Sequence, residues 1–168
     1  MSKKIQRNYL EINFLEDLKE NSDFSKNYSI NLVDPVDFQL NKFFYKNIGK
    51  NHHWIDRLVW TEKQWINYVS DKNVKTYVLK NEKDLAGYFE LILHQEKDEV
   101  EIAYLGLLNE YQNKKLGSCL LSAAIKNSFL NNPKRVWVHT CSLDHKNALK
   151  NYLSRGMKVF KEETLFVN

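Results

Sequence analysis

Apolar and polar residues alternate along three neighbouring segments in the middle of the chain, residues 74–80, 85–94 and 99–108. Alternation with a period of two is typical of strands, because successive side chains point to opposite faces of a sheet. The turns between the segments, NEKD and QEKD, are short and polar, which favours antiparallel neighbours. The pattern therefore predicts an antiparallel meander of three strands.

Helical spacing of apolar residues lies on both sides of this meander. Thr61 is a predicted N-cap, and Gly49 and Gly156 are predicted helix ends. The remaining predicted elements are a strand over residues 28–34, helices over 36–49, 62–70, 114–130 and 144–155, a strand over 135–141, and one or two strands over 157–167. This order predicts an α/β fold with a mixed, mostly antiparallel sheet flanked by helices.

The first 27 residues are polar and mixed in composition. The spacing of Ile5, Tyr9, Ile12 and Leu15 predicts a short helix there. We expect residues 1–27 to form an extension that packs on or precedes one domain over residues 28–168, since a chain of 168 residues suits a single domain.

The composition excludes several classes of protein. Apolar residues make up 43% of the chain, enough for a core, so a wholly disordered chain is excluded. The chain has neither an apolar run of the length that crosses a bilayer nor an apolar signal region at its N-terminus. Two cysteines cannot form a disulfide framework or a four-cysteine zinc site. We expect a cytoplasmic protein without membrane contacts or a bound metal.

The net charge of +4 comes from 25 basic and 21 acidic residues, and only four of the basic residues are arginines. The lysines are interleaved with Asp and Glu along the chain. Bidentate recognition of phosphates and bases favours arginine. A solvated surface is therefore the better interpretation of the charge, and nucleic acid is not an expected partner.

Residues 107–118, LLNEYQNKKLGS, pass directly from a predicted strand into a predicted helix. Free N–H groups at a helix N-terminus bind phosphate oxygens. Lys114 and Lys115 add positive charge, Gly117 permits close approach, and Ser118 offers a hydroxyl. On these residues alone, an ordinary polar turn before a helix is the better interpretation, and the Walker A pattern is absent.

The stretch from Gln112 to Gly117 resembles the [QR]-x-x-G-x-[GA] signature of the GCN5-related N-acetyltransferases (GNAT family). Gln112 and Gly117 match, whereas Lys115 stands where the signature has its first glycine. Downstream, the order of a strand, an Asn-Ala pair, a Tyr, a Gly and another strand is also similar to this family, with Met in place of the usual Phe. The matching residues are Asn147, Ala148, Tyr152, Gly156 and Met157. The resemblance covers about residues 74–163 and is weaker over 28–73.

The resemblance implies a GNAT-like fold and acetyl-CoA as the acyl-donor cosubstrate. In this family the turn before the helix holds the pyrophosphate, and the pantetheine arm pairs with a splayed strand, here AYLGLL. The residues implied for cofactor binding are Leu107, Leu108, Gln112, Asn113, Lys114, Lys115, Leu116, Gly117, Ser118 and Asn147.

The resemblance also implies candidate catalytic residues. Tyr152, five residues after Asn147, stands where the family has a proton donor to the leaving thiolate. Glu101, 11 residues before Gln112, stands where one branch of the family has its general base, although a solvent-facing Glu explains it equally well. The other candidates for the base are Glu90, His139, Asp144 and His145.

The segment NHHWIDRLVWTEKQW concentrates aromatic and charged residues in 15 positions. Aromatic rings and an acid can receive a cationic amine, so the sequence favours an acceptor pocket made by Trp54, Asp56, Arg57 and Glu90. Core packing of the tryptophans is the alternative.

The sequence thus favours an N-acetyltransferase that acts on a primary amine of a small molecule. A protein or peptide amine as the acceptor, and a non-catalytic acyl-CoA-binding module, remain alternatives, because fold does not fix function. A homodimer is the base-rate expectation for a small α/β enzyme.

Overall fold

The computed structural model describes residues 1–168, and its seven strands form one sheet in the order β2-β3-β4-β5-β6-β1-β7. All neighbouring strands are antiparallel except β5 and β6, which are parallel. The strands are β1 (Lys3–Ile12), β2 (Tyr28–Leu32), β3 (Val74–Asn81), β4 (Asp84–His94), β5 (Glu99–Leu107), β6 (Arg135–Cys141) and β7 (Lys158–Val167). The predicted mixed, mostly antiparallel sheet is therefore confirmed.

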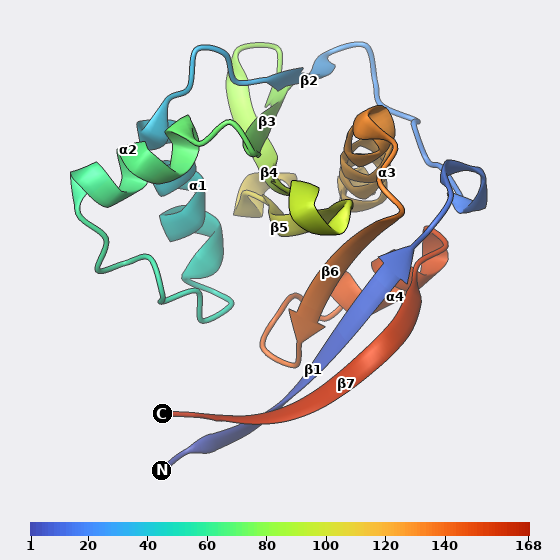
Figure 1. The fold of residues 1–168 in the computed structure, drawn as a ribbon. Coiled ribbons are helices and arrows are strands. Elements are labelled where there is room, and N and C mark those ends of the chain that lie inside the picture. The colour runs from blue at the N-terminus through green and yellow to red at the C-terminus, as the bar shows by residue number, and fades with distance from the viewer.

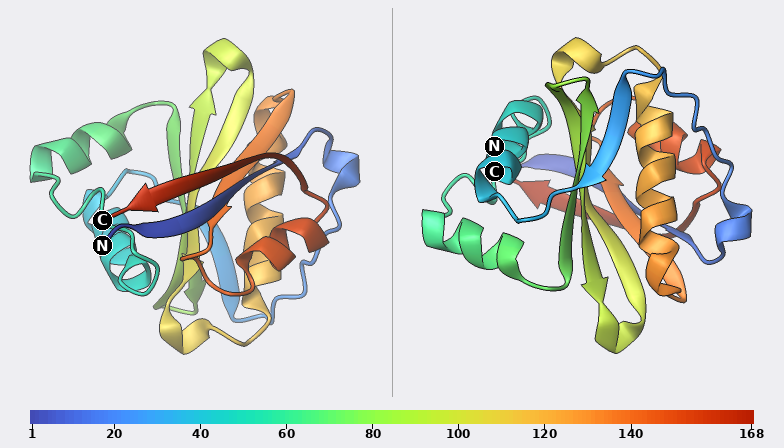
Figure 2. Two further views of the ribbon diagram at one scale, coloured as in Figure 1. Left: turned by 90° about the horizontal axis from the view of Figure 1, so that it is seen from below. Right: turned by 90° about the horizontal axis from the view of Figure 1, so that it is seen from above.

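Four helices cover the sheet, two on each face, as Figure 2 shows. They are α1 (Phe38–Gly49) and α2 (Glu62–Ser70) on one face, and α3 (Leu116–Ser128) and α4 (Ala148–Ser154) on the other. Helix α2 begins with a capping box, in which Thr61 and Gln64 exchange side chain to backbone hydrogen bonds. The larger hydrophobic core lies between the sheet and α3, and a smaller one lies under α1.

The helix predicted near the N-terminus is wrong, because residues 3–12 form strand β1. This strand lies inside the sheet and pairs with β6 on one side and β7 on the other. In a strand, Ile5 and Tyr9 lie on one face and Ile12 on the other. Apolar residues from two faces of an internal strand thus imitated helical spacing. Figure 1 shows the two chain ends side by side at the end of the β1–β7 pair.

Residues 1–27 therefore contribute an internal strand of the sheet as well as a connection. That connection, residues 13–27, contains one turn of 3₁₀ helix and runs past α4 and α3 to reach β2. Gly156 passes so close to it that a Cβ there would lie 2.3 Å from the carbonyl oxygen of Asp17. The φ of Gly156 is 102°, in the region that glycine favours.

Strands β5 and β6 separate soon after they begin to pair. Their hydrogen-bonded register runs only from Glu99–Arg135 to Glu101–Trp137. The β4–β5 register then shifts, since Leu91 pairs with Ile102 but Glu90 pairs with Tyr104, which leaves Ala103 as a bulge. Beyond this point, one edge of β5 has no strand partner, and a cleft opens beside it.

Candidate active site

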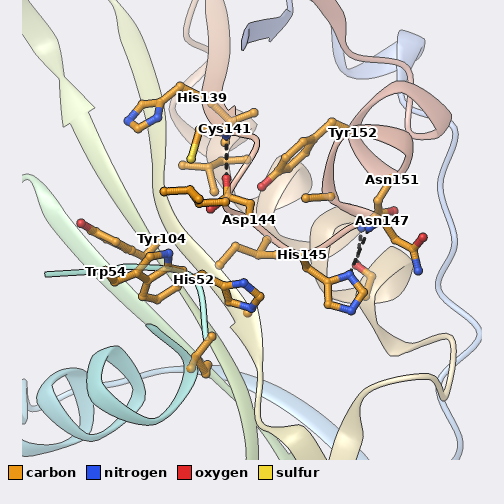
Figure 3. A pocket seen from close by; sticks show the side chains of 18 of the residues that line it. His52, Trp54, Tyr104, His139, Cys141, Asp144, His145, Asn147, Asn151 and Tyr152 are labelled. Carbon is orange, nitrogen blue, oxygen red and sulfur yellow. Dashed lines mark hydrogen bonds between the residues drawn. The ribbon is translucent and has the colours of Figure 1, made fainter. Parts of the chain in front are cut away.

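A cleft of about 1210 Å³ lies between the separated ends of β5 and β6. The first turn of α3 and residues 52–57 of the loop after α1 both line it. Figure 3 shows side chains from this loop, from β5 and β6, and from α4 directed into one space. The separation of β5 and β6 thus creates a cavity that is lined by most of the candidate site residues.

The turn before α3 has an unusual backbone. Asn113 and Lys115 have φ values of 62° and 63°, in the left-handed region. Asn tolerates this region, whereas a residue such as Lys adopts it at a cost of about 1–2 kcal/mol. Lys115 therefore adopts the conformation that a glycine at the same position would reach without strain.

The six peptide N–H groups of residues 113–118 donate to no carbonyl or side-chain acceptor in the protein. They gather at the N-terminus of α3, where the helix dipole adds partial positive charge. Asn151, from α4, donates a hydrogen bond to the carbonyl of Gly117 (3.1 Å) and so fixes the position of this turn. The turn can hold an anion such as a diphosphate through its backbone.

Most of the residues expected to bind the cofactor line this cleft. They are Leu107, Gln112, Asn113, Lys115, Leu116, Gly117, Ser118 and Asn147. Leu108 and Lys114 do not line it: Leu108 is buried with its N–H bonded to Ala86, and Lys114 lies over the ring of Tyr111. The hydroxyl of Ser118 donates to the carbonyl of Lys115 (3.1 Å), so its proton is already engaged.

Tyr152 lies in α4 and lines the cleft, although only 8% of the residue is exposed. Figure 3 shows its hydroxyl directed toward Asp144. Burial, together with the negative charge of Asp144, raises the pKa of this phenol above its ordinary value of 10.0. The phenol of Tyr152 is neutral at pH 7, as an ordinary tyrosine is, so it carries the proton that a donor requires.

Helix α4 starts at Ala148 and not at residue 144 as predicted. The reason is that the carboxylate of Asp144 accepts hydrogen bonds from the hydroxyl of Thr140 and the N–H of Cys141, which forms a tight turn after β6. Asp144 is thus occupied at the end of the strand, and Asn147 becomes the residue before the helix.

Glu101 also lines the cleft, at its narrow end where β5 and β6 still pair. Its carboxylate lies 3.0 Å from Nε2 of His94. His139 stands nearby on β6; its side chain is exposed at the wall of the cleft, and partial loss of solvent there, with the charge of Arg7, lowers its pKa below the ordinary 6.5. An imidazole with a lowered pKa is neutral at pH 7, so His139 remains a second candidate for proton abstraction.

The expected acceptor residues divide into two groups. Trp54, Asp56 and Arg57 line the cleft, whereas Glu90 does not and is 0% exposed. Trp54 packs against the ring of Tyr104 (centroids 4.7 Å apart) and over Gly49, where a Cβ would lie 2.5 Å from that of Trp54. The tryptophan thus belongs partly to the core and partly to the wall of the cleft.

Arg57 and Glu90 form a buried ion pair beneath this wall. Nη1 of Arg57 lies 2.9 Å from Oε1 of Glu90, which also accepts a hydrogen bond from the hydroxyl of Tyr68 (2.6 Å). The other carboxylate oxygen accepts from Asn41 (3.1 Å). Five aromatic rings surround the guanidinium, with centroids 4.1–5.8 Å away: Tyr45, Trp60, Trp65, Tyr68 and Tyr104. Glu90 is therefore fully occupied, and it anchors the loop rather than facing an acceptor.

The sequence reasoning missed several residues of the cleft, among them Asn21, Tyr104 and Asn151. Asn151 follows Asn147 by four residues, a spacing that places both on one face of a helix, so this signal was available. Asn21 comes from the connection after β1, and only the tertiary structure brings it here.

The structure contains no group of three or more His, Cys, Asp or Glu side chains that could hold a metal ion. No helix is both long and apolar enough to cross a membrane.

Comparison with known proteins agrees with this geometry. The model of the acetyltransferase (GNAT) family matches residues 38–157, which include the turn of residues 112–118 and most of the cleft. The chain belongs to the GNAT acetyltransferase family. The resemblance noted in the sequence is thereby confirmed. No curated protein matches the sequence.

Solved structures show the same GNAT fold at low sequence identity. A GCN5-related N-acetyltransferase from Sphaerobacter thermophilus has a TM-score of 0.74 and 12% identity, over 98% of this chain and 52% of that one. A functionally unknown protein from Staphylococcus epidermidis has a TM-score of 0.68 and 18% identity, over 98% of this chain and 62% of that one. This GNAT chain thus spans only about half to two thirds of their length.

A third structure has nearly the length of this chain. It is an aminoglycoside acetyltransferase from an uncultured soil metagenomic sample, in complex with trehalose. Its TM-score is 0.64 and its identity 14%, over 78% of this chain and 88% of that one. At these identities the likeness establishes the fold.

Proposed function

We propose that this protein transfers an acetyl group from acetyl-CoA to a primary amine of a small molecule. The observation that carries the proposal is that five residues with free N–H groups at the start of α3, Asn113 and residues 115–118, line the same cleft as one unpaired edge of β5. A diphosphate needs the first feature, and an arm with amide groups needs the second. Membership in the GNAT family supports the same donor.

The residues of the donor side fit acetyl-CoA. The turn from Asn113 to Ser118 would hold the pyrophosphate, with Lys115 adding positive charge, and β5 from Ala103 to Leu107 would pair with the pantetheine arm. Bound acetyl-CoA would supply the acetyl group as an activated thioester. Asn147 lines the opposite wall, within the same cleft.

The two proton transfers of this proposal belong to Glu101 and Tyr152. Glu101 takes a proton from the ammonium of the acceptor, because it lines the narrow end of the cleft and His94 holds its carboxylate. Tyr152 gives its proton to the sulfur that leaves, because it lines the same cleft and its phenol is protonated at neutral pH. The amine gains a bond to the acetyl carbon as the bond from that carbon to sulfur breaks, so the products are an amide and a thiol.

The acceptor side supports a small molecule rather than a protein chain. His52 and Trp54, from the loop of residues 50–57, line this part of the cleft, and the ring of Trp54 packs against that of Tyr104. Aromatic walls receive cationic amines well. One protein of the same fold is an aminoglycoside acetyltransferase. This supports a small-molecule amine as the acceptor. A protein or peptide amine is the alternative acceptor.

The first experiment is thermal unfolding of the protein with and without acetyl-CoA. A ligand at 100 times its Kd adds about 2.7 kcal/mol of stability, which raises Tm by several degrees. Amines are then screened by the release of free thiol. No shift with acetyl-CoA, CoA or longer acyl-CoAs would overturn the proposal, whereas binding without turnover of any amine would favour a non-catalytic acyl-CoA-binding module.

Tyr152→Phe tests the proton donor once an acceptor is found. General acid catalysis contributes about 100-fold or more, so we expect kcat to fall by about this factor. The Kd of CoA should stay the same, because the phenol oxygen makes no hydrogen bond that holds the turn. An unchanged kcat would remove Tyr152 from the mechanism.

A further inference from the structure

The connection between β1 and β2, residues 13–27, is tied to the first turns of α3 through Asn21. The side-chain amide of Asn21 donates to Oγ of Ser118 (2.7 Å), and its backbone N–H donates to Oγ of Ser122 (2.9 Å). Its side-chain oxygen accepts from the N–H of Asp23 (3.1 Å). Because both ends of the amide are engaged, the side chain has one orientation, with its N–H groups toward α3.

Ser118 connects Asn21 to the turn through two hydrogen bonds. Its hydroxyl accepts from Asn21 and donates its own proton to the carbonyl of Lys115 (3.1 Å). The three residues form a chain of hydrogen bonds from the connection to the residue with φ 63°. In such a chain each bond strengthens the next.

Lys115 is the position in the turn that most needs support. A lysine has the left-handed conformation as a minor state, whereas a glycine reaches it freely. The conformation of Lys115 sets where the preceding residues of the turn, Asn113 and Lys114, lie relative to the N–H groups of residues 116–118, because Lys115 directly precedes the helix. A turn that adopts the competent conformation only part of the time binds its ligand more weakly by that fraction.

We propose that Asn21 is a positioning residue for CoA: through Ser118 it holds Lys115 in the left-handed conformation that the phosphate-binding turn requires. The chain Asn21–Ser118–Lys115 thereby replaces what a glycine at position 115 would provide. The proposal rests on the proposed function of this turn, and it assigns to residues 13–27 a part in binding the cofactor.

The test is the Kd of CoA, measured by calorimetry, for a double-mutant cycle. One hydrogen bond of this kind corresponds to roughly a three- to tenfold change in an equilibrium constant. We expect Asn21→Ala and Ser118→Ala each to weaken CoA binding by about this factor. In a Lys115→Gly background, Asn21→Ala should change the Kd less than about twofold, because the glycine needs no support.

Glu20→Gln is the matched control. Glu20 lies beside Asn21 in the same connection and joins the same helix through Lys126 (2.8 Å), but it does not contact the turn. A general loosening of the connection would follow from this substitution too, whereas the proposed chain would stay intact. We expect the Kd of CoA to remain unchanged in Glu20→Gln.

The outcomes separate this proposal from the proposed function. If the unaltered protein binds CoA and Asn21→Ala weakens it by the same factor with Lys115 or Gly at position 115, Asn21 acts independently of Lys115 and the inference is wrong. It is equally wrong if neither Asn21→Ala nor Ser118→Ala affects the Kd. If the unaltered protein does not bind CoA, the proposed function itself fails, and this inference with it.

Discussion

The donor half of the cleft is built mainly from backbone, whereas the acceptor half is built from buried side chains. In the donor half, free N–H groups of residues 113–118 and the open edge of β5 face the cleft. In the acceptor half, the loop of residues 50–57 rests on the ion pair of Arg57 and Glu90 and on the rings around it. The two halves should therefore respond differently to substitution.

A site made of backbone depends on conformation more than on residue type. Lys115 replaces the glycine of the family signature and still has a φ of 63°. A site supported by a buried ion pair depends on each partner, because removal of one leaves the other charge without a counter-charge. This contrast leads to substitutions that separate stability from cofactor binding.

The largest effect is expected for Glu90→Ala. Its side chain is 0% exposed and bonds Arg57, Tyr68 and Asn41. Removal of the carboxylate leaves the guanidinium buried without a partner, which costs about 3–5 kcal/mol. Urea unfolding should show this loss in the free energy of unfolding, while any folded protein should bind CoA as before.

The exposed pair of Glu20 and Lys126 provides the comparison for this prediction. Glu20→Gln breaks an ion pair that solvent screens, so the free energy of unfolding should change by less than about 1 kcal/mol. If Glu90→Ala were as mild as Glu20→Gln, the buried pair would not support the acceptor half.

A smaller effect is expected for Gly117→Ala, which lies in the donor half of the cleft. A Cβ at this position would meet only Nδ2 of Asn151, at 3.7 Å, so the helix accepts the methyl group. Alanine favours helix over glycine by up to about 1 kcal/mol, and unfolding should show a small gain in stability. The methyl group lies where phosphate oxygens approach the free N–H groups, so CoA should bind about tenfold more weakly, the equivalent of one lost hydrogen bond to a charged group.

We therefore expect Gly117→Ala to raise the stability of the protein while it lowers the affinity for CoA. A Kd for CoA that is unchanged in Gly117→Ala would mean that the cofactor does not approach the first turn of α3. It would count against the turn as a phosphate site without affecting the fold.

Local signals in the sequence were sufficient for most of the fold. The meander, the N-cap at Thr61 and the end of α4 at Gly156 depend on residues close together in the chain. Strand β1 was missed because its apolar side chains lie on both faces, and its pairing with β6 joins residues more than 120 positions apart. Period alone cannot reveal an internal strand of this kind.

The candidate site also has parts that a local motif reveals and parts that depend on contacts between distant residues. The turn at residues 112–118 could be found from a short motif, because its backbone conformation is local. The partnership of Arg57 and Glu90 could not, since the two residues are 33 positions apart and their ionic contact depends on how α2 packs on the sheet. Asn21 and Ser118 are 97 positions apart, and no pattern in the sequence joins them.

The smallest effect is expected for Tyr88→Phe, and it sharpens the contrast within the acceptor side. Tyr88 is 0% exposed and stacks on Phe44, but its hydroxyl has no hydrogen-bond partner. Loss of an unsatisfied buried hydroxyl should leave the free energy of unfolding at pH 7 unchanged or raise it by up to about 1 kcal/mol. Tyr68→Phe is the matched variant: its hydroxyl bonds Glu90 at 2.6 Å, so its loss should cost about 1.5–3 kcal/mol.

Tyr88→Phe should also change how the free energy of unfolding depends on pH, in a direction that follows from the pKa of Tyr88. Burial raises the pKa of Tyr88 well above 10.0 in the folded protein, while the unfolded chain keeps the ordinary value. Above pH 10 the unfolded state therefore releases a proton that the folded state retains, and stability falls as pH rises. Urea unfolding at pH 7 and pH 10.5 should show a smaller loss for Tyr88→Phe than for the unaltered protein. An equal loss in both would mean that the phenol of Tyr88 ionises as readily inside the protein as in water, which its complete burial against Phe44 opposes.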